Sequence, residues 1–218
     1  MLPRRWSGPC PRVFRALTNR LAMTAGRLVE RVTPAHRSML QAFFAAHSNG
    51  CFCQWWHFAG DKNDWQLRCA AASENDLQMQ TQLAADRPEM HGFVARQDDQ
   101  VLGWLKLSTA EHVNKLYEQR LYRGLPCFEG DRRGVYTVGC LLVSEAHRRT
   151  GIARSLLQHA VAWARAHGAR AVEAFPHRAA QPHPAGLWLG PYTLYEELGF
   201  QTVHAFEPYP VLRLSFSA

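Results

Sequence analysis

The sequence predicts a single domain of the α/β (α+β) class over residues 27–218. Short segments rich in β-branched and aromatic residues alternate with longer segments that carry an apolar stripe at helical spacing. No linker or internal repeat interrupts this alternation after residue 26, and a chain of 218 residues suits one hydrophobic core. No apolar run approaches the roughly 18 residues that a membrane span requires, so no membrane partner is expected.

The basic charge of the chain is concentrated at its N-terminal end. Of the 25 Lys and Arg residues, five lie within residues 1–26, where there is no acidic residue, so much of the net charge of +7 belongs to this segment. We expect a basic, disordered extension; a transit peptide or a start at Met23 are the alternatives. The rest of the chain is nearly balanced in charge, so no nucleic-acid partner is expected. Six cysteines are too few to predict a disulfide scaffold, which favours a reduced, cytoplasmic location.

The first half of the domain predicts a strand, helices and a hairpin. Residues 27–33 alternate as a strand, and residues 34–47 follow as a helix with proline in its first turn. Residues 62–86 have a helical pattern with a break near Ser73. Two alternating segments around a polar turn then predict a hairpin, at residues 92–97 and 101–108.

The second half contains the strongest strand signal in the chain, VYTVGCLLV at residues 135–143, after a turn-rich stretch at 111–133. A helix is predicted from residue 151 to residue 167, where Gly168 ends it. A strand, a proline-rich loop, a short helix and two strands complete the chain, at residues 171–175, 176–190, 191–198, 200–206 and 211–216.

The junction between the strongest strand and the helix after it carries the clearest sign of function. A helix N-terminus presents unpaired N–H groups and the positive end of the helix dipole. Gly151 and Ala153 have little or no side chain, so a ligand can approach the backbone closely. Three arginines add positive charge at the same place: Arg148, Arg149 and Arg154. These features predict a cradle for a pyrophosphate, although the P-loop and dinucleotide-binding glycine patterns do not occur.

This junction resembles the acetyl-coenzyme A loop of the GNAT superfamily of N-acyltransferases. Arg148, Gly151 and Ala153 satisfy the family consensus Q/R-x-x-G-x-G/A. The run YEELGF, from Tyr195 to Phe200, matches a second family element, Y-E-x-x-G-F. The resemblance covers residues 27–218 in element order. It implies the GNAT fold: a central, mixed, mostly antiparallel twisted sheet of six to seven strands, flanked by helices and splayed at the coenzyme-binding strand.

The resemblance implies acetyl-CoA as cosubstrate and assigns its binding residues. The backbone of Leu141, Leu142 and Val143 would pair with the pantetheine arm, where the family's sheet splays at a bulge. Gly139 is a bulge candidate on independent grounds, because glycine inside an apolar strand often marks one. The loop would hold the pyrophosphate through Arg148, Arg149, Thr150, Gly151, Ile152, Ala153 and Arg154.

The resemblance also implies that an acetyl group moves to a primary amine by direct attack in a ternary complex, with no metal. Tyr195 occupies the family's general-acid position, where a phenol with a pKa near ~10 protonates the departing thiolate. Glu173 lies where some relatives carry a general base, and the alternative is a solvated glutamate on the outer face of the sheet. Glu129 and Asp131 are second choices. Cys140 offers a covalent route, but a cysteine inside an apolar strand is usually core.

The acceptor side departs from the family pattern. Trp188 stands where many relatives have an asparagine, seven residues before Tyr195, and residues 191–195 replace the usual A-x-x-F-Y. The loop at 176–190 is longer than common, and prolines stiffen it at Pro176, Pro182 and Pro184. These departures predict a specialised lid over the acceptor.

The segment CFCQWWHF, residues 51–58, follows the first helix and in the family borders the acceptor side of the cleft. We expect Trp55 or Trp56 to line the acceptor pocket while its neighbour anchors the segment in the core. Aromatic faces favour an apolar or cationic amine. If the segment is extended, Cys51 and Cys53 share one face, and both are expected to be packed and reduced.

Several alternatives stay open. Trp104 is either a third pocket residue or core beneath the sheet. The acceptor is a small-molecule amine or a protein amine, and the protein is a monomer or a homodimer. A coenzyme-binding sensor without activity is one competing function. A zinc module is the other, since four possible ligands lie within one stretch: Cys51, Cys53, His57 and Cys69.

Overall fold

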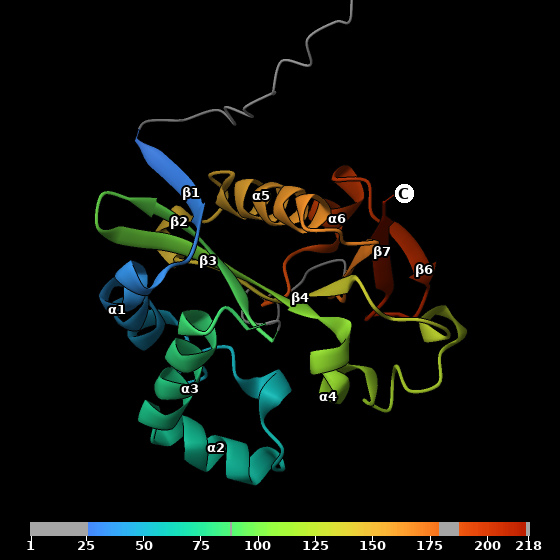
Figure 1. Ribbon diagram of the computed structural model, residues 1–218, viewed down its shortest axis with the longest axis horizontal. Coiled ribbons are helices and arrows are strands. Elements are labelled where there is room, and N and C mark those ends of the chain that lie inside the picture. The colour runs from blue at the N-terminus through green and yellow to red at the C-terminus, as the bar shows by residue number, and fades with distance from the viewer. Residues whose placement is uncertain (1–25, 88, 179–187, 217–218) are drawn as a thin grey trace, which may run out of the picture.

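The computed structural model describes residues 26–87, 89–178 and 188–216. Their strands form one seven-stranded sheet in the order β1-β2-β3-β4-β5-β7-β6, with helices on both faces (Figure 1). Residues 1–25 of the predicted extension, Met23 included, and residues 179–187 of the predicted lid lie outside the described residues. The α/β class and the mixed, mostly antiparallel sheet are confirmed.

The predicted strands and helices are all present, with small differences at their ends. The strands are β1 (Arg27–Arg31), β2 (His91–Gln97), β3 (Gln100–Thr109), β4 (Val135–Val143), β5 (Ala171–Ala174), β6 (Gln201–His204) and β7 (Val211–Ser215). The α-helices are α1 (Arg37–His47), α2 (Lys62–Ala70), α3 (Ser73–Ala84), α4 (Asn114–Tyr117), α5 (Ile152–Ala166) and α6 (Tyr192–Glu197). Short 3-10 turns are η1 (Pro34–His36), η2 (Trp55–His57), η3 (Ala110–His112), η4 (Pro126–Phe128) and η5 (Glu145–His147).

The sheet opens between β4 and β5. These two strands run parallel, whereas every other neighbouring pair is antiparallel. Their pairing covers only Val135–Thr137 against Ala171–Glu173, although β4 continues to Val143. The C-terminal half of β4 therefore borders an opening in the sheet.

The predicted bulge in β4 is confirmed at Gly139. Lys106 of β3 pairs with Cys140, and the next residue, Leu107, pairs with Val138. Gly139 is therefore the extra residue on β4. A bulge bends a strand and increases its twist, which helps β4 to turn away from β5.

The hydrophobic core is divided between the two faces of the sheet. On one face α5 buries the predicted apolar stripe, and α6 joins the same cluster. On the other face α1 and α3 cover β2 and β3, through Leu40, Phe44 and Met79. Figure 1 shows α5 and α6 on one side of the sheet and α1 to α4 on the other.

The segment at 51–58 is a compact turn and not an extended strand. Phe52 and Cys53 both have positive φ angles, 45° and 56°, and Trp55–His57 forms η2. A left-handed backbone breaks the alternation of faces, so the shared face considered for the two cysteines does not follow from strand geometry. Phe52 packs in the core against Phe44, with ring centroids 5.3 Å apart. The segment is therefore fastened beneath the sheet opening by its own aromatic residues.

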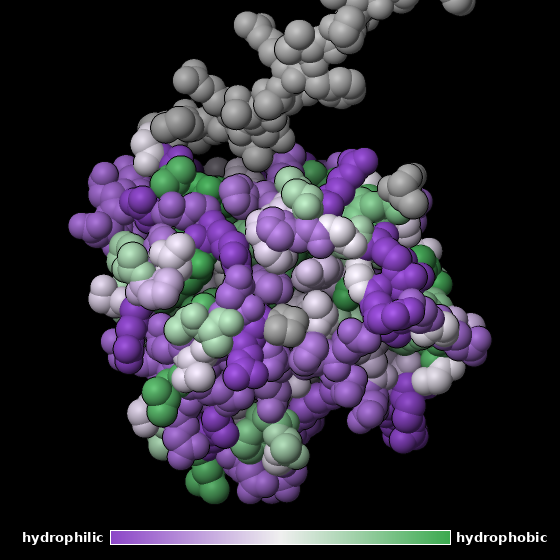
Figure 2. All heavy atoms as spheres, in the orientation of Figure 1, coloured by the Kyte–Doolittle hydropathy of each residue, from purple (hydrophilic) through white to green (hydrophobic). Residues whose placement is uncertain are grey.

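The surface carries its large hydrophobic side chains in separate places. Figure 2 shows a mainly hydrophilic face with hydrophobic residues in small groups. Leu67 of α2 and Leu77 of α3 are the most exposed of the large hydrophobic residues, at 72% and 63%. Within the described ranges, no helix has both the length and the apolar character needed to cross a membrane.

Candidate active site

The start of α5 is a turn that favours glycine. Gly151 has a φ angle of 86° and stands directly before Ile152, the first residue of α5. Nothing lies within 4 Å of a Cβ built on Gly151, so packing would allow a side chain there. Glycine is favoured because the backbone is left-handed at this position. The first N–H groups of a helix have no intrahelical partners. Here they border an open space.

A cavity of about 1100 Å³ connects this helix start with the segment at 51–58. One group of lining residues belongs to the loop and to α5: Arg148, Arg149, Gly151, Ile152, Ala153 and Arg154. A second group is the bulged part of β4: Gly139, Cys140, Leu141, Leu142 and Val143. A third group is Cys51, Cys53, Trp55, Trp56 and Trp188. The structure thus brings most of the predicted coenzyme and acceptor residues to one cavity.

The loop before α5 is held by its own hydrogen bonds. Thr150 is the one predicted loop residue that does not line the cavity, and its hydroxyl donates to the His147 carbonyl at 2.7 Å. The side chain of His147 contacts the Ser144 hydroxyl at 2.8 Å through Nδ1 and so helps to fix the loop. Arg154 forms an ion pair with Glu197 of α6, and Arg148 lies beside the Val143 carbonyl. The loop end of the cavity therefore carries positive charge on a fixed backbone.

The edge of β4 that faces the opening is hydrogen-bonded to two of the tryptophans that line the cavity. The Leu141 amide donates to the Trp188 carbonyl at 2.8 Å. The Trp56 indole Nε1–H donates to the Gly139 carbonyl at 3.1 Å. The two indoles stack, with centroids 5.5 Å apart and an interplanar angle of 30°. The Trp188 carbonyl therefore accepts the hydrogen bond of the Leu141 amide, which the resemblance assigns to the pantetheine arm.

Tyr195 is fully buried in the core cluster of α5 and α6, against Phe200. Its hydroxyl donates to the Leu189 carbonyl, and burial raises the pKa of the phenol far above its usual value. Tyr195 does not line the cavity, but its hydroxyl would be only 3.4 Å from a Cβ on Gly190, which does. Gly190 therefore lies between the Tyr195 phenol and the cavity.

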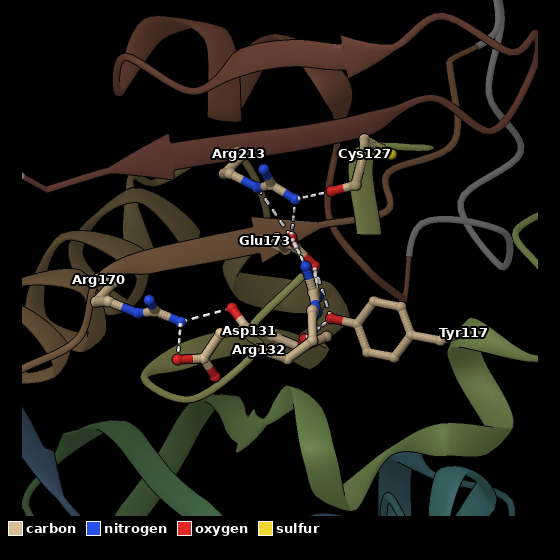
Figure 3. Close-up of polar contacts among 8 residues, drawn as sticks. Tyr117, Cys127, Asp131, Arg132, Arg170, Glu173 and Arg213 are labelled. Atoms are coloured by element: carbon tan, nitrogen blue, oxygen red, sulfur yellow. Dashed lines mark hydrogen bonds and ion pairs between the residues drawn. The ribbon is translucent and has the colours of Figure 1, made fainter. Parts of the chain in front are cut away.

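Glu173 lies at the centre of a buried ion-pair network (Figure 3). Arg132 donates to both of its oxygens, at 2.9 and 2.6 Å, and Arg213 donates to Oε1 from Nε and Nη2, at 2.9 and 2.6 Å. The Tyr117 hydroxyl donates to the same carboxylate at 2.7 Å. The carboxylate is fully buried and does not line the cavity. The alternative of a solvated glutamate is wrong, and these contacts favour a structural role over the general base expected from the resemblance.

The second-choice bases also lie outside the cavity wall. Asp131 is an exposed ion-pair partner of Arg133 and Arg170, and the hydrogen bond from Arg133 lowers its pKa to about 2. Glu129 directly follows η4, and neither carboxylate is among the residues that line the cavity. As the structure stands, neither carboxylate would contact a substrate in the cavity directly.

Both tryptophans of the segment at 51–58 line the cavity, and they are held differently. Trp56 is buried and bonded to β4, as described above. One face of Trp55 is covered by the Lys115 ammonium, which lies 3.5 Å from the ring centroid and donates to the Phe58 carbonyl at 2.8 Å. The chain thus supplies its own cation to Trp55, which leaves the remaining indole surface for a ligand.

Trp104 is a core residue and not a third pocket residue, so the prediction that it contacts substrate is wrong and the core alternative holds. Its side chain is fully buried, does not line the cavity, and packs edge-on against Phe44 with centroids 5.2 Å apart. The reason is its position in β3, where the face on which Trp104 lies is covered by α1.

The sequence reasoning missed Lys106, a polar residue near the cavity, and considered its neighbour His57 only as a zinc ligand. Lys106 of β3 is fully buried, and its ammonium contacts His57 Nε2 at 2.6 Å. The signal in the sequence is a lysine inside the apolar run VLGWLKL. This contact also argues against the zinc alternative, because a metal on His57 Nε2 would face an ammonium. Among the described residues, no group of three or more His, Cys, Asp or Glu side chains is placed to hold a metal ion.

A sheet that opens beside a bulged strand, with a helix start at the opening, defines the N-acyltransferase class of fold. The model of the acetyltransferase (GNAT) family matches residues 58–200, which is more than half of the chain. The chain therefore belongs to the GNAT family.

Solved structures agree with this fold. PaiA N-acetyltransferase from Thermoplasma acidophilum, in complex with coenzyme A, is 9% identical, with a TM-score of 0.53 over 87% of this chain and 99% of that one. An N-acetyltransferase from Staphylococcus aureus Mu50 is 16% identical, with a TM-score of 0.53 over 87% and 98%. A GCN5-related N-acetyltransferase from Kribbella flavida is 20% identical, with a TM-score of 0.51 over 88% and 98%. No curated protein matches the chain.

Proposed function

We propose that the protein is an N-acetyltransferase that moves the acetyl group of acetyl-CoA to a primary amine. The observation that carries the proposal is the single cavity that joins the arginine-rich start of α5 to the bulged edge of β4 and to the tryptophans. A pyrophosphate fits the first part, because unpaired N–H groups and three arginines meet there without a side chain on Gly151. A pantetheine arm fits the second part, where β4 continues without β5.

In the proposed reaction, one group of residues orients the thioester and another residue supplies the proton for the leaving group. Leu141, Leu142 and Val143 offer backbone groups that pair with the arm and orient the thioester. The amine nitrogen attacks the carbonyl carbon, so that a C–N bond forms and the C–S bond breaks. Tyr195 gives its proton to the departing sulfur, and the proton lost by the nitrogen returns to the phenol through solvent. Direct attack is preferred over a covalent route: Cys140 lines the cavity, but it packs in an apolar core cluster, and a cysteine in such surroundings is usually inert.

The acceptor side fits an amine attached to an apolar or aromatic group. Trp55, Trp56 and Trp188 form this part of the wall, and the cation site on Trp55 is already taken by Lys115. A protein amine is the second candidate, and a panel of both kinds of acceptor distinguishes them.

Acetyl-CoA is expected to raise the melting temperature, since a ligand that binds only the folded state stabilises it. Gly151→Val should abolish the shift, because the side chain enters the open space at the start of α5 and the positive φ angle is lost. Gly124→Val is the matched control, since Gly124 also has a positive φ angle, 74°, and open space around it, but lies outside the cavity. Both variants lose stability, and only Gly151→Val loses the ligand shift. An unchanged melting temperature of the wild-type protein at millimolar acetyl-CoA contradicts the proposal.

Coenzyme binding is also expected to move Trp188 away from Trp56. The Leu141 amide has one hydrogen to donate, and the pantetheine arm competes for it with the Trp188 carbonyl. Tryptophan fluorescence should change when coenzyme A is added, and most of the change should vanish in Trp188→Phe. Trp163→Phe, on α5 and outside the cavity, should keep it. An equal change in both variants would show that Trp188 stays in place.

The competing function is a protein that binds acyl-CoA without transferring the acyl group. The two are separated by the release of free coenzyme A thiol in the presence of a panel of primary amines. Release with at least one amine supports the transferase. Binding of acetyl-CoA without release on any amine supports the sensor.

A further inference from the structure

Lys106 is a buried cation next to the cavity whose partners are neutral. Its side chain is fully buried in the middle of β3. The ammonium donates to the Cys53 carbonyl at 2.8 Å and contacts His57 Nε2 at 2.6 Å. A lysine is almost never fully buried unless it is paired with an opposite charge. Its location therefore calls for an explanation.

The titratable groups that face Lys106 are one imidazole and three thiols. His57 comes from η2, Cys51 and Cys53 from the turn before it, and Cys140 from β4. In the part of the chain that the structure describes, no carboxylate is among the groups whose charge acts on Lys106. The positive charge is therefore not neutralised by a neighbouring side chain.

Lys106 is charged at neutral pH, and His57 is not. Burial lowers the pKa of Lys106 to about 8, so the ammonium predominates below that pH. Burial and the charge of Lys106 lower the pKa of His57 to about 2, so the ring is neutral and its Nε2 accepts from the ammonium. His57 thus holds the cation in place and adds no charge of its own.

The cation lies directly behind the cavity wall, at the bulge of β4. A Cβ built on Gly139 would lie 3.5 Å from both Cδ and Cε of Lys106. Gly139 and its neighbours Cys140 and Cys53 line the cavity, whereas Lys106 does not. A thioester oriented by Leu141 would therefore react beside this charge, with one layer of residues between them.

We propose that the buried ammonium of Lys106 acts across the Gly139 bulge to stabilise negative charge on the thioester oxygen and on the departing sulfur. The inference rests on the proposed function, since it concerns the same cavity. A fixed charge in a region of low dielectric stabilises developing charge without reorganisation during the reaction. The same field disfavours an ammonium at the acceptor position and so favours the neutral, nucleophilic amine. Lys106 touches no reacting atom and acts only through its electric field.

The test measures the ionisation of the bound coenzyme A thiol, which needs no knowledge of the acceptor. Ultraviolet absorbance of the thiolate is followed against pH in the coenzyme A complex. The complex with desulfo-coenzyme A, which lacks the sulfur, is subtracted so that the protein's own cysteines cancel. We expect the acid dissociation constant of the bound thiol, taken from the thiolate fraction at pH values below 8 where Lys106 keeps its proton, to be about tenfold larger in the wild-type protein than in Lys106→Met. Lys62→Met removes an exposed cation from α2 and should match the wild type.

Each result decides between the two proposals. If coenzyme A raises the melting temperature of neither protein, the proposed function fails. If it stabilises both proteins and the thiol constants are equal, the role of Lys106 is overturned. A purely structural Lys106 would change stability and leave the bound thiol unaffected. If Lys106→Met does not fold, the wild-type complex is compared with free coenzyme A: a tenfold larger constant supports the proposal, and an equal one overturns it.

Discussion

Replacing Glu173 with glutamine is expected to lower the free energy of unfolding by about 3 kcal/mol, as in other buried ion pairs that lose one partner. The substitution removes the charge that both Arg132 and Arg213 pair with inside the sheet. Those guanidiniums keep side-chain exposures of 19% and 23%, so partial hydration holds the cost near the lower end of the range for buried pairs. Urea unfolding measures the effect.

The matched control is Asp131→Asn. Asp131 also pairs with two arginines, but its side chain is 42% exposed, so water screens the pair and the loss of stability should be much smaller than for Glu173→Gln. The experiment also decides the role of Glu173. A general base would show as a variant of normal stability whose acetylation rate falls and whose pH profile loses its acidic limb. A large loss of stability with an unchanged pH profile identifies a structural carboxylate.

Tyr195→Phe is expected to lower the rate of acetyl transfer by about 100-fold or more while the coenzyme still binds. The substitution removes the proton for the departing sulfur and leaves the ring packed against Phe200. It also removes the hydrogen bond to the Leu189 carbonyl, which costs about 1 kcal/mol of stability. Release of free thiol with an amine panel measures the rate, and the acetyl-CoA shift in melting temperature reports binding.

The pH dependence gives a second check on Tyr195. Because burial raises the pKa of this phenol far above its usual value, the acid form persists throughout the neutral and alkaline range. Loss of activity at alkaline pH should therefore not arise from Tyr195. Tyr136→Phe serves as the control, because Tyr136 lies on β4 outside the cavity wall and packs against Trp163. A Tyr195→Phe variant with the full rate would assign the proton to another donor.

The geometry of the junction between β4 and α5 was predictable because its determinants are local. The strand at 135–143 and the helix after it are adjacent in sequence, and the glycine and arginines lie in the loop between them. Helix termini, left-handed glycines and strand bulges depend on a few consecutive residues, so their chemistry can be read before the fold is known. The bulge at Gly139 was predicted in this way, and the structure confirms it. At Gly151 the sequence predicted a close approach to the backbone, and the structure adds that this glycine has a left-handed conformation.

The surroundings of the other predicted site residues were less predictable because their contacts join distant segments. Glu173 meets arginines 41 and 40 residues away, and a single strand register decides whether its side chain faces solvent or the network. Trp104 became core because α1 covers its face of β3. The turn at Phe52 and Cys53 needs positive φ angles at residues that rarely adopt them, so no local rule predicted it.

The sequence by itself determined the fold class, the order of the elements and the arginine-rich start of α5, because periodicity and loop composition are properties of neighbouring residues. Only the tertiary structure decided which polar groups are buried together. In the folded chain Glu173 is part of an ion-pair network, and the Trp188 carbonyl accepts a hydrogen bond from the Leu141 amide. The Lys106 ammonium is buried behind the bulge of β4 without a carboxylate partner among the described residues. Burial and pairing set the charge of such groups, and both depend on strands and turns that only folding brings together.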